Sequence, residues 1–175
     1  MSAAKHLIVY VWLCFACVTG YSQTSDSCNR TNIEFQFLQK WVGEWVGVGN
    51  ITGEPVVYAV NAHWVLDSQF IALHLVDTAA VPAYEANIYF GFDCNAHQFI
   101  VHWIDNFGPA FSQTLGYGHL TGNILPLTFN YPDGAFLNTF TYHSSSDTWT
   151  SVSTFQTAEK QWASFGDITF TKKSN

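Results

Sequence analysis

Asp105 is the carboxylate of this sequence best placed to do chemistry. It follows Trp103 by two residues in the apolar run 98–105, which is typical of a β-strand, so both side chains lie on one face. A carboxylate turned into an apolar interior needs a partner, because an unpaired buried charge is costly. A nearby histidine or tyrosine would complete an acid–base pair. Alternatively, Asp105 ends the strand and caps the turn at residues 106–109, which is the interpretation we favour.

The histidines are not arranged as a local metal chelate. No two of them are spaced as His-x-His on a strand or His-x-x-x-His on a helix, so we expect no metal, and a site assembled across strands stays an alternative. His74 shares a strand face with Phe70 and Val76, and His119 shares one with Tyr117. Either histidine projects into the interior toward a ligand, or it is hydrogen-bonded within the wall.

Signatures of nucleophilic catalysis are missing from the sequence. No serine lies in Gly-x-Ser-x-Gly, and no glycine-rich phosphate loop precedes a helix. We therefore lean toward a protein that binds rather than an enzyme. An enzyme that uses an internal cavity for acid–base chemistry stays the alternative.

The first 22 residues have the pattern of a signal peptide. Lys5 and His6 precede an apolar run at residues 7–18, and small residues follow it. The run is too short to cross a bilayer, for which a helix needs about 20 residues. A buried amino-terminal helix is the alternative. We expect a secreted protein, extracellular or, in a bacterium, periplasmic, with no membrane attachment after cleavage.

Two cysteines remain after that cleavage, Cys28 and Cys94. An even pair in an oxidising compartment predicts one disulfide, and two free buried thiols are the alternative. Asn29 and Asn50 each begin an Asn-x-Thr sequon, which would carry a glycan only in a eukaryote.

Charge and composition limit the classes of molecule that the protein can bind. The formal net charge is −7, from 13 acidic and 6 basic residues, so binding to nucleic acid or to an anionic membrane is not expected. Charged residues make up 11% of the chain, whereas aromatic residues make up 17%. Such a composition predicts either a large aromatic core or a cavity lined with aromatic side chains.

Strands must position these residues, because from residue 43 onward the chain consists of β-prone runs separated by tight turns. Short links can only join antiparallel neighbours. We predict an all-β, antiparallel, up-and-down barrel, since closure removes the exposed edges. The expected strands are 44–52, 56–66, 69–77, 84–92, 98–105, 110–120, 123–130, 136–143, 148–156 and 163–171.

The domain organisation follows from this pattern. Residues 1–22 are the signal peptide, 23–42 form an arm with a short helix, and 43–175 form the barrel. Phe37, Leu38 and Trp41 share one face of that helix, which we expect to cap one end of the barrel.

Alternation along the strands predicts which side chains face the interior. It is clear in 84–92, 136–143 and 148–156, whereas 69–77 and 98–105 are apolar on both faces. The side chains expected to line a ligand site are Trp45, His74, Trp103, Asp105, Tyr117, His119, Tyr142 and Trp149.

Some of these residues lie in motifs that resemble known families. The segment Gly43-Glu44-Trp45-Val46-Gly47-Val48-Gly49 resembles the Gly-x-Trp opening of calycins and, in its longer form, is similar to nitrobindin-like proteins. Further stretches resemble an uncharacterised calycin-like domain of unknown function, over nearly the whole mature chain: Trp64-Val65-Leu66-Asp67, Gly91-Phe92-Asp93, residues 103–108, Gly116-Tyr117-Gly118, Tyr131-Pro132-Asp133-Gly134 and residues 162–167.

The nitrobindin resemblance implies a haem held by a histidine after the last strand. Here the tail at residues 171–175 contains no histidine, so we disfavour haem and expect no cofactor. The sequence therefore predicts a lipocalin-like protein that binds one small apolar or aromatic molecule inside its barrel. A filled barrel that acts through its outer face is a further alternative, and the oligomeric state stays open.

Overall fold

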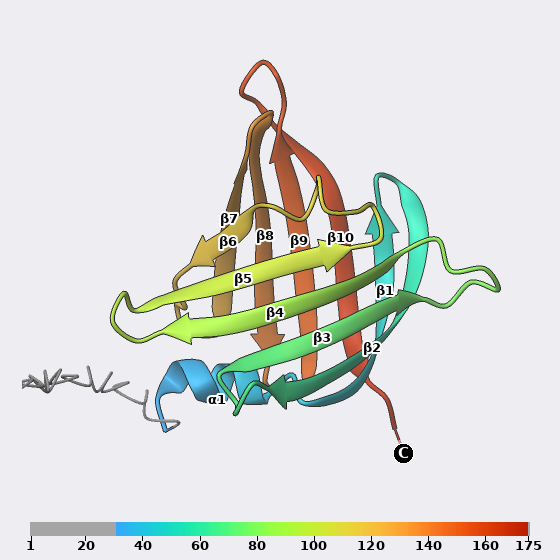
Figure 1. Cartoon of the computed structure of the whole chain (residues 1–175). Coiled ribbons are helices and arrows are strands. Elements are labelled where there is room, and N and C mark those ends of the chain that lie inside the picture. Colours follow the sequence, from blue (N-terminus) through green and yellow to red (C-terminus); the bar gives the residue numbers. More distant parts are fainter. Residues whose placement is uncertain (1–30, 175) are drawn as a thin grey trace, which may run out of the picture.

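The computed structural model describes residues 31–174, which form a closed antiparallel barrel with one short helix (Figure 1). The helix is α1 (Ile33–Gln39). The strands are β1 (Gly43–Ile51), β2 (Glu54–Val65), β3 (Phe70–Asp77), β4 (Glu85–Asp93), β5 (Gln98–Asp105), β6 (Leu115–Gly118), β7 (Ile124–Tyr131), β8 (Gly134–His143), β9 (Thr148–Gln156) and β10 (Trp162–Lys172). Each strand pairs with its neighbours in sequence, and β1 pairs with β10 to close the barrel. The predicted all-β, up-and-down architecture is confirmed.

The strand predicted at 110–120 is largely wrong, because β6 spans only Leu115–Gly118. Gly108 has a φ of +99°, and backbone hydrogen bonds from Phe111 to Gly108 and from Ser112 to Pro109 fold the preceding segment into turns. Proline also has no N–H to give to a strand ladder. A long loop between β5 and β6 therefore replaces half of the expected strand.

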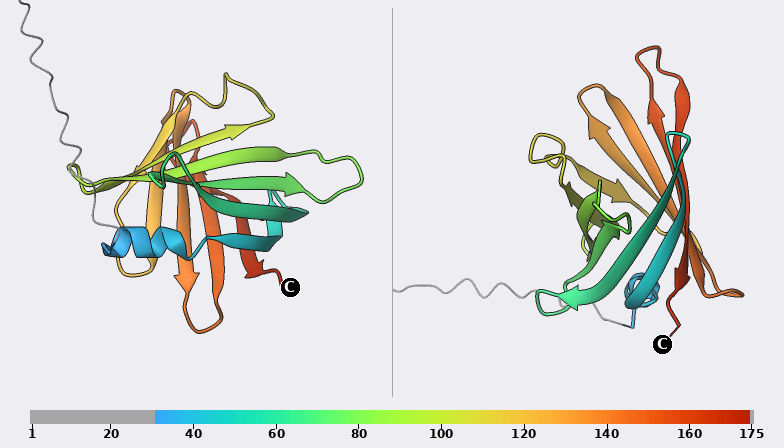
Figure 2. Two further views of the ribbon diagram at one scale, coloured as in Figure 1. Left: turned by 60° about the horizontal axis from the view of Figure 1, so that its bottom comes forward. Right: turned by 90° about the vertical axis from the view of Figure 1, so that its right-hand side faces the viewer.

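The helix α1 closes one end of the barrel, as predicted (Figures 1 and 2). Phe37 packs edge-on against Phe99 and Trp149. Just after the helix, Trp41 stacks on Trp149 with ring centroids 4.3 Å apart and an interplanar angle of 11°. Trp45 donates its indole N–H to the carbonyl oxygen of Trp41 at 2.6 Å. We call these aromatic side chains, Phe37, Trp41, Trp45 and Trp149, the floor, and the end of the barrel that they fill the closed end.

Glycine allows β1 to approach β10 closely. A Cβ atom on Gly49 would overlap the backbone carbonyl oxygen of Asp167, and one on Gly47 would lie 2.7 Å from the ring of Phe170. These contacts explain the Gly-x-Gly that follows Trp45.

Above the floor the interior contains apolar side chains from most strands, for example Leu73, Phe90, Val101 and Leu127, whereas β1 and β9 contribute their buried apolar side chains, Trp45 and Trp149, to the floor itself. β6 turns Gly116 and Gly118 inward, and the ring of Phe129 covers Gly116. Within the described part of the chain, no helix is long and apolar enough to cross a membrane.

Candidate functional site

The end of the barrel opposite α1 is lined by one carboxylate and by aromatic side chains that are half-buried, apart from Tyr58, which is buried. We call this end the mouth and define it by Tyr58, Tyr84, Trp103, Asp105, Tyr131 and Phe136. Tyr58 lies near the start of β2, Trp103 and Asp105 near the end of β5, Tyr131 at the end of β7, and Phe136 near the start of β8. Up-and-down connectivity brings these strand ends together at one rim.

Asp105 caps the turn after β5, as favoured from the sequence, and it also has a tyrosine as hydrogen-bond partner. Its Oδ1 accepts a hydrogen bond from the backbone N–H of Phe107 at 3.1 Å, so the carboxylate caps the turn after β5. Its Oδ2 accepts one from the hydroxyl of Tyr84 at 3.2 Å. That hydroxyl in turn accepts the indole N–H of Trp103 at 2.7 Å. Trp103, Tyr84 and Asp105 therefore form one hydrogen-bonded chain across the wall of the mouth.

The loop between β5 and β6 holds this carboxylate in place. The hydroxyl of Ser112 accepts the backbone N–H of Asp105 at 3.4 Å and donates to the carbonyl oxygen of Gly108 at 3.3 Å. On the outer face, His102 donates its Nε2–H to the carbonyl oxygen of Ser112 at 2.8 Å. The ring of Phe107 lies 5.5 Å from that of Tyr84. His102 therefore supports the loop and does not itself reach the mouth.

Electrostatics keep the phenols of the mouth neutral. Burial raises the pKa of the Tyr84 hydroxyl, the indole N–H of Trp103 opposes this effect, and the charge of Asp105 raises the pKa further. Burial and the charge of Asp105 also raise the pKa of Tyr131. For Tyr58, burial and the charge of Asp77 raise the pKa. These hydroxyls therefore serve as hydrogen-bond donors rather than as bases near neutral pH.

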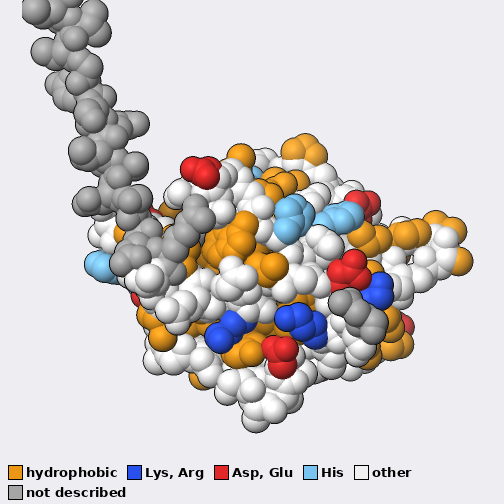
Figure 3. Space-filling model, turned by 90° about the horizontal axis from the view of Figure 1, so that it is seen from below, with side chains coloured by type: hydrophobic (Ala, Val, Ile, Leu, Met, Phe, Trp, Pro, Cys, Tyr) orange, Lys and Arg blue, Asp and Glu red, His pale blue; other side chains and the backbone are white. Residues whose placement is uncertain are grey.

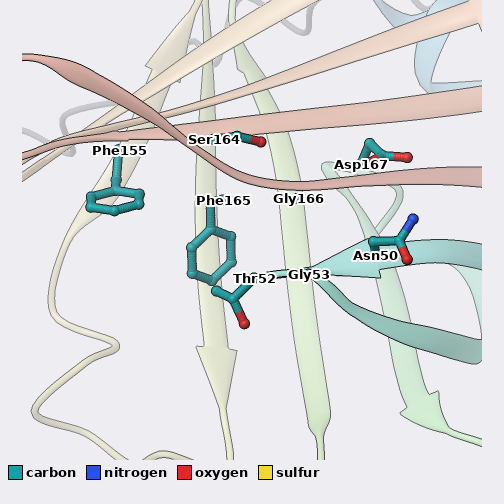
Figure 4. A pocket seen from close by; sticks show the side chains of 8 residues that line it. All are labelled: Asn50, Thr52, Gly53, Phe155, Ser164, Phe165, Gly166 and Asp167. Carbon is teal, nitrogen blue, oxygen red and sulfur yellow. The ribbon is translucent and has the colours of Figure 1, made fainter.

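A hollow of about 450 Å³ lies at the rim beside the mouth, where the β1–β2 turn meets β9 and β10 (Figure 4). Phe155 and Phe165 line it together with the carboxylate of Asp167. Phe165 also packs edge-on against Phe136 of the mouth, with ring centroids 5.1 Å apart. Through Phe165 the hollow, which we call the rim hollow, therefore adjoins the aromatic lining of the mouth, although no residue that defines the mouth lines the hollow itself.

Five of the side chains predicted to face inward do so. Trp103 and Asp105 lie at the mouth, whereas Trp45, Tyr142 and Trp149 lie at the closed end and are at least nine-tenths buried. Those three pack against other rings, for example Tyr142 on Trp149 at 5.1 Å. They contribute to a filled core rather than to the wall of an open cavity.

The expectation that His74, Tyr117 and His119 face inward is wrong. Leu73 and Leu75 occupy the inward positions of β3, so His74 lies on the outer face and pairs with Glu85 at 2.7 Å. In β6 the inward positions belong to glycines, which leaves Tyr117 40% exposed on the outside. His119 donates to the carbonyl oxygen of His97 on the same surface.

The expectation that the ligand site lies inside the barrel also differs from the structure. The two best-formed hollows among the described residues are the rim hollow and one of about 300 Å³ on the outer faces of β1, β2 and β3, lined by His74, Asn61 and Lys173 among others. Both are open to the surface. Any ligand site consistent with this geometry lies at the mouth and rim, and not in the centre of the barrel.

The described histidines do not fit the haem that the nitrobindin resemblance implies. All six lie on outward strand positions or in turns, at His63, His74, His97, His102, His119 and His143. None of these imidazoles faces the interior to serve as an axial ligand. Among the described residues, no group of three His, Cys, Asp or Glu side chains is arranged to hold a metal.

Sequence reasoning missed the tyrosines of the mouth. Tyr84 precedes Ala86, Ile88 and Phe90 at even spacing, and these side chains face inward, so the strand pattern itself contained the signal. Cys94 lies in the turn between β4 and β5, and Cys28 lies outside the described residues, so their disulfide stays a prediction. Of the two sequons, Asn29 also lies outside, whereas Asn50 is exposed on β1.

Comparisons with known proteins agree with the fold. The model of a family described as "Protein of unknown function (DUF1579)" matches residues 31–172. The crystal structure of Rv2717c from M. tuberculosis is similar with a TM-score of 0.58 and 13% sequence identity, covering 82% of this chain and 99% of that chain. At this identity the likeness concerns the fold alone. No curated protein matches the chain.

Proposed function

The chain belongs to DUF1579, a family of proteins of unknown function, and we propose that it is a binding protein for one small apolar or aromatic molecule, held at the mouth and rim hollow. One observation carries this proposal. Inward-facing aromatic side chains stay half-buried around the open end, beside a hollow of about 450 Å³. Ligand sites typically have about 300–1,000 Å³, aromatic walls and a few polar groups that fix orientation. Asp105 and the neutral hydroxyls of Tyr84 and Tyr131 provide those polar groups.

A ligand screen tests the proposal. Fatty acids, retinoids, porphyrins and small aromatic compounds are added, and tryptophan fluorescence and the melting temperature are recorded, because a ligand that prefers the folded state raises that temperature by mass action. Trp103 lies at the mouth and reports on a ring stacked there.

Variants then locate the site. Phe165→Ala removes a wall of the rim hollow and Tyr131→Ala removes one of the mouth, so each should weaken binding of a hit by about tenfold. Tyr117→Ala is the matched control, since it removes an exposed ring from the outer face. Equal effects of Tyr117→Ala and Tyr131→Ala, or no ligand in any class, would refute the site.

Acid–base catalysis at the same place is the second candidate, supported by the bond between Tyr84 and Asp105. With its raised pKa, Tyr84 would orient a substrate and Asp105 would accept its proton. An enzyme predicts that Asp105→Asn abolishes turnover of a bound compound, whereas a binding protein predicts only a graded change in affinity.

Export is part of the proposal. The apolar run at residues 7–18 and the small residues after it support cleavage near residue 22, and an oxidising compartment would allow the pairing of Cys28 with Cys94. We also propose that the protein works without haem, on the ground of the outward histidines.

A further inference from the structure

We infer that the mouth selects ligands that carry a positive charge, of the organic ammonium class. The inference rests on the proposed binding function and adds the chemistry of the ligand. It depends on what surrounds Asp105 and on how charge is distributed between the two ends of the barrel.

The carboxylate of Asp105 has no cation among the described residues. The ion pairs there are His74–Glu85 and Glu44–Lys173, and neither lies at the mouth. Asp105 is held by neutral donors only, the hydroxyl of Tyr84 and the backbone N–H of Phe107. A half-buried carboxylate that lacks a counter-charge makes a site where an added cation is bound favourably.

Aromatic faces beside that carboxylate suit the same ligand. A cation within about 6 Å of a ring centroid is attracted to the ring, most strongly by tryptophan and tyrosine. Tyr84 bonds directly to Asp105, Trp103 bonds to Tyr84, and Tyr131 is close enough for the charge of Asp105 to raise its pKa. The phenols stay neutral, so they add no competing charge.

The closed end shows the same kind of pairing with cations supplied by the chain itself. Lys40 lies over the ring of Tyr142 at 4.8 Å, and Lys172 lies over the ring of Trp45 at 5.3 Å. Figure 3, which views the molecule from that end, shows basic side chains among apolar ones. The rings of the mouth have no such lysine among the described residues. Tyr84 packs against Phe107 and Tyr131 stacks on Phe129, so a ligand reaches the ring surfaces that these contacts leave open.

The open half of the barrel is more acidic than the closed end. The closed end carries three lysines, Lys40, Lys172 and Lys173, beside five acidic side chains, Glu34, Glu44, Asp67, Asp93 and Asp147. The open half has one described lysine, Lys160 in the β9–β10 loop, and more acidic side chains. The acidic side chains of the open half are Glu54, Asp77, Glu85, Asp105, Asp133, Glu159 and Asp167. Their summed field raises the local concentration of cations at the mouth and disfavours anions.

Probes of nearly equal size test the inference. Benzylammonium, benzyl alcohol and phenylacetate present a cation, a neutral group and an anion on the same ring, and phenyltrimethylammonium presents a cation without an N–H donor. Affinities of the full chain are measured by isothermal titration calorimetry, at low salt and at about 0.15 M salt, where exposed charges further apart than roughly 8 Å are screened. We expect benzylammonium to bind at least tenfold more tightly than benzyl alcohol, and phenylacetate most weakly.

Asp105→Asn is the decisive variant, because it removes the charge while the amide oxygen can still accept the backbone N–H of Phe107 and the amide nitrogen can donate to the hydroxyl oxygen of Tyr84. It should lower the affinity for both cations by about tenfold and leave benzyl alcohol within about twofold. Asp133→Asn removes one exposed charge from the β7–β8 turn and serves as the matched control, with less than a twofold effect at the higher salt. Thermal unfolding of each variant verifies that it is folded.

The outcomes separate this inference from the proposed function. Benzyl alcohol or phenylacetate binding as tightly as benzylammonium, with sensitivity to Tyr131→Ala, would overturn the charge selection and keep the binding site. Cation binding that Asp105→Asn does not change would also overturn it. If binding of every probe is insensitive to Tyr131→Ala and Phe165→Ala, the proposed site itself fails.

Discussion

Trp41 and Trp45 form a matched pair that tests how the closed end is stabilised. Both indoles are almost fully buried, at 0% and 1% exposure, and their ring centroids lie 5.7 Å apart. Trp45 donates its N–H to the carbonyl oxygen of Trp41, whereas the N–H of Trp41 has no acceptor among the described residues. The same substitution to phenylalanine should therefore have different effects at the two positions.

The expected magnitudes follow from two contributions. Replacing a buried indole by a phenyl ring leaves a cavity of about 40 Å³, which costs about 1 kcal/mol at ~24 cal/mol per Å³. In Trp45→Phe, loss of the hydrogen bond adds about 1 kcal/mol. In Trp41→Phe, the substitution removes a buried N–H donor that has no acceptor among the described residues, and this should increase stability by roughly 1–3 kcal/mol. Trp45→Phe should thus destabilise by about 2 kcal/mol, and Trp41→Phe should lie between neutral and a stabilisation of about 2 kcal/mol.

Urea unfolding of the two variants measures this difference. The midpoints are compared at equal slope, since an altered slope would report a change in the surface exposed on unfolding rather than in stability alone. Trp45→Ala provides the upper reference, with an expected loss of about 3–5 kcal/mol. A loss for Trp41→Phe as large as that for Trp45→Phe would refute the reasoning and show that an ordered water satisfies the N–H of Trp41.

Four further predictions follow from the same structure. Gly49→Ala should destabilise by about 1–3 kcal/mol, measured by urea unfolding, because its Cβ atom would overlap a carbonyl oxygen of β10. Intact mass before and after reduction and alkylation should show Cys28 and Cys94 paired, and two thiols that alkylate without reduction would contradict this. Folding raises the pKa of Tyr84 above its value near 10 in the unfolded chain. The contribution of Tyr84 to stability is therefore fully present below the pKa of the unfolded state and is lost as the pH rises through the pKa of the folded state. Unfolding curves from pH 8 to 11 should show that Tyr84→Phe loses less stability at alkaline pH than the wild type does. Titration with hemin should give no sharp 1:1 shift of the Soret band, and a shift that a single histidine variant abolishes would contradict the proposal of a haem-free protein.

The sequence predicted the barrel because its connectors are short. Turns such as the one at Thr52 and Gly53, between β1 and β2, leave no room for a parallel crossover, so sequential antiparallel pairing follows from length alone. Strand faces were predictable where polar residues alternate with apolar ones, as in β4, β8 and β9. In β3 both faces are apolar, and the choice of Leu73 over His74 for the interior depends on packing that alternation does not encode.

The candidate site was predicted only in part because its contacts are non-local. The side chains of Trp103 and Asp105 were recognised from their own strand, but the partner Tyr84 reaches them through the antiparallel pairing of β4 with β5. The orientation of Tyr117 was missed because the aromatic ring was assigned to the interior, whereas the glycines beside it take the inward positions. The ring of Phe129 covers Gly116, and the backbone of Pro126 approaches Gly118, so a side chain at either position would overlap β7.

The many aromatic side chains of the chain fall into two groups, one that fills the closed end and one that lines the mouth. At the closed end, rings such as Trp41 and Trp149 pack against one another and stabilise the barrel. Between floor and mouth, β8 and β9 present a polar patch on one side of the apolar interior, in which Ser151 donates to Asn138 at 2.7 Å and Ser153 donates to the carbonyl oxygen of Gly166 at 3.2 Å.

This polar patch adds to the filled apolar core in limiting how deep the proposed ligand would reach. Buried hydroxyls and an amide that already bond to the protein would have to lose those bonds to admit an apolar group, at a cost that the mouth does not impose. On the proposed function, an apolar or aromatic ring would therefore be held at the level of Phe136 and Tyr131, above the polar patch. Substitutions in the floor should change stability with little effect on affinity, and substitutions in the mouth should do the reverse, because no single ring belongs to both the floor and the mouth.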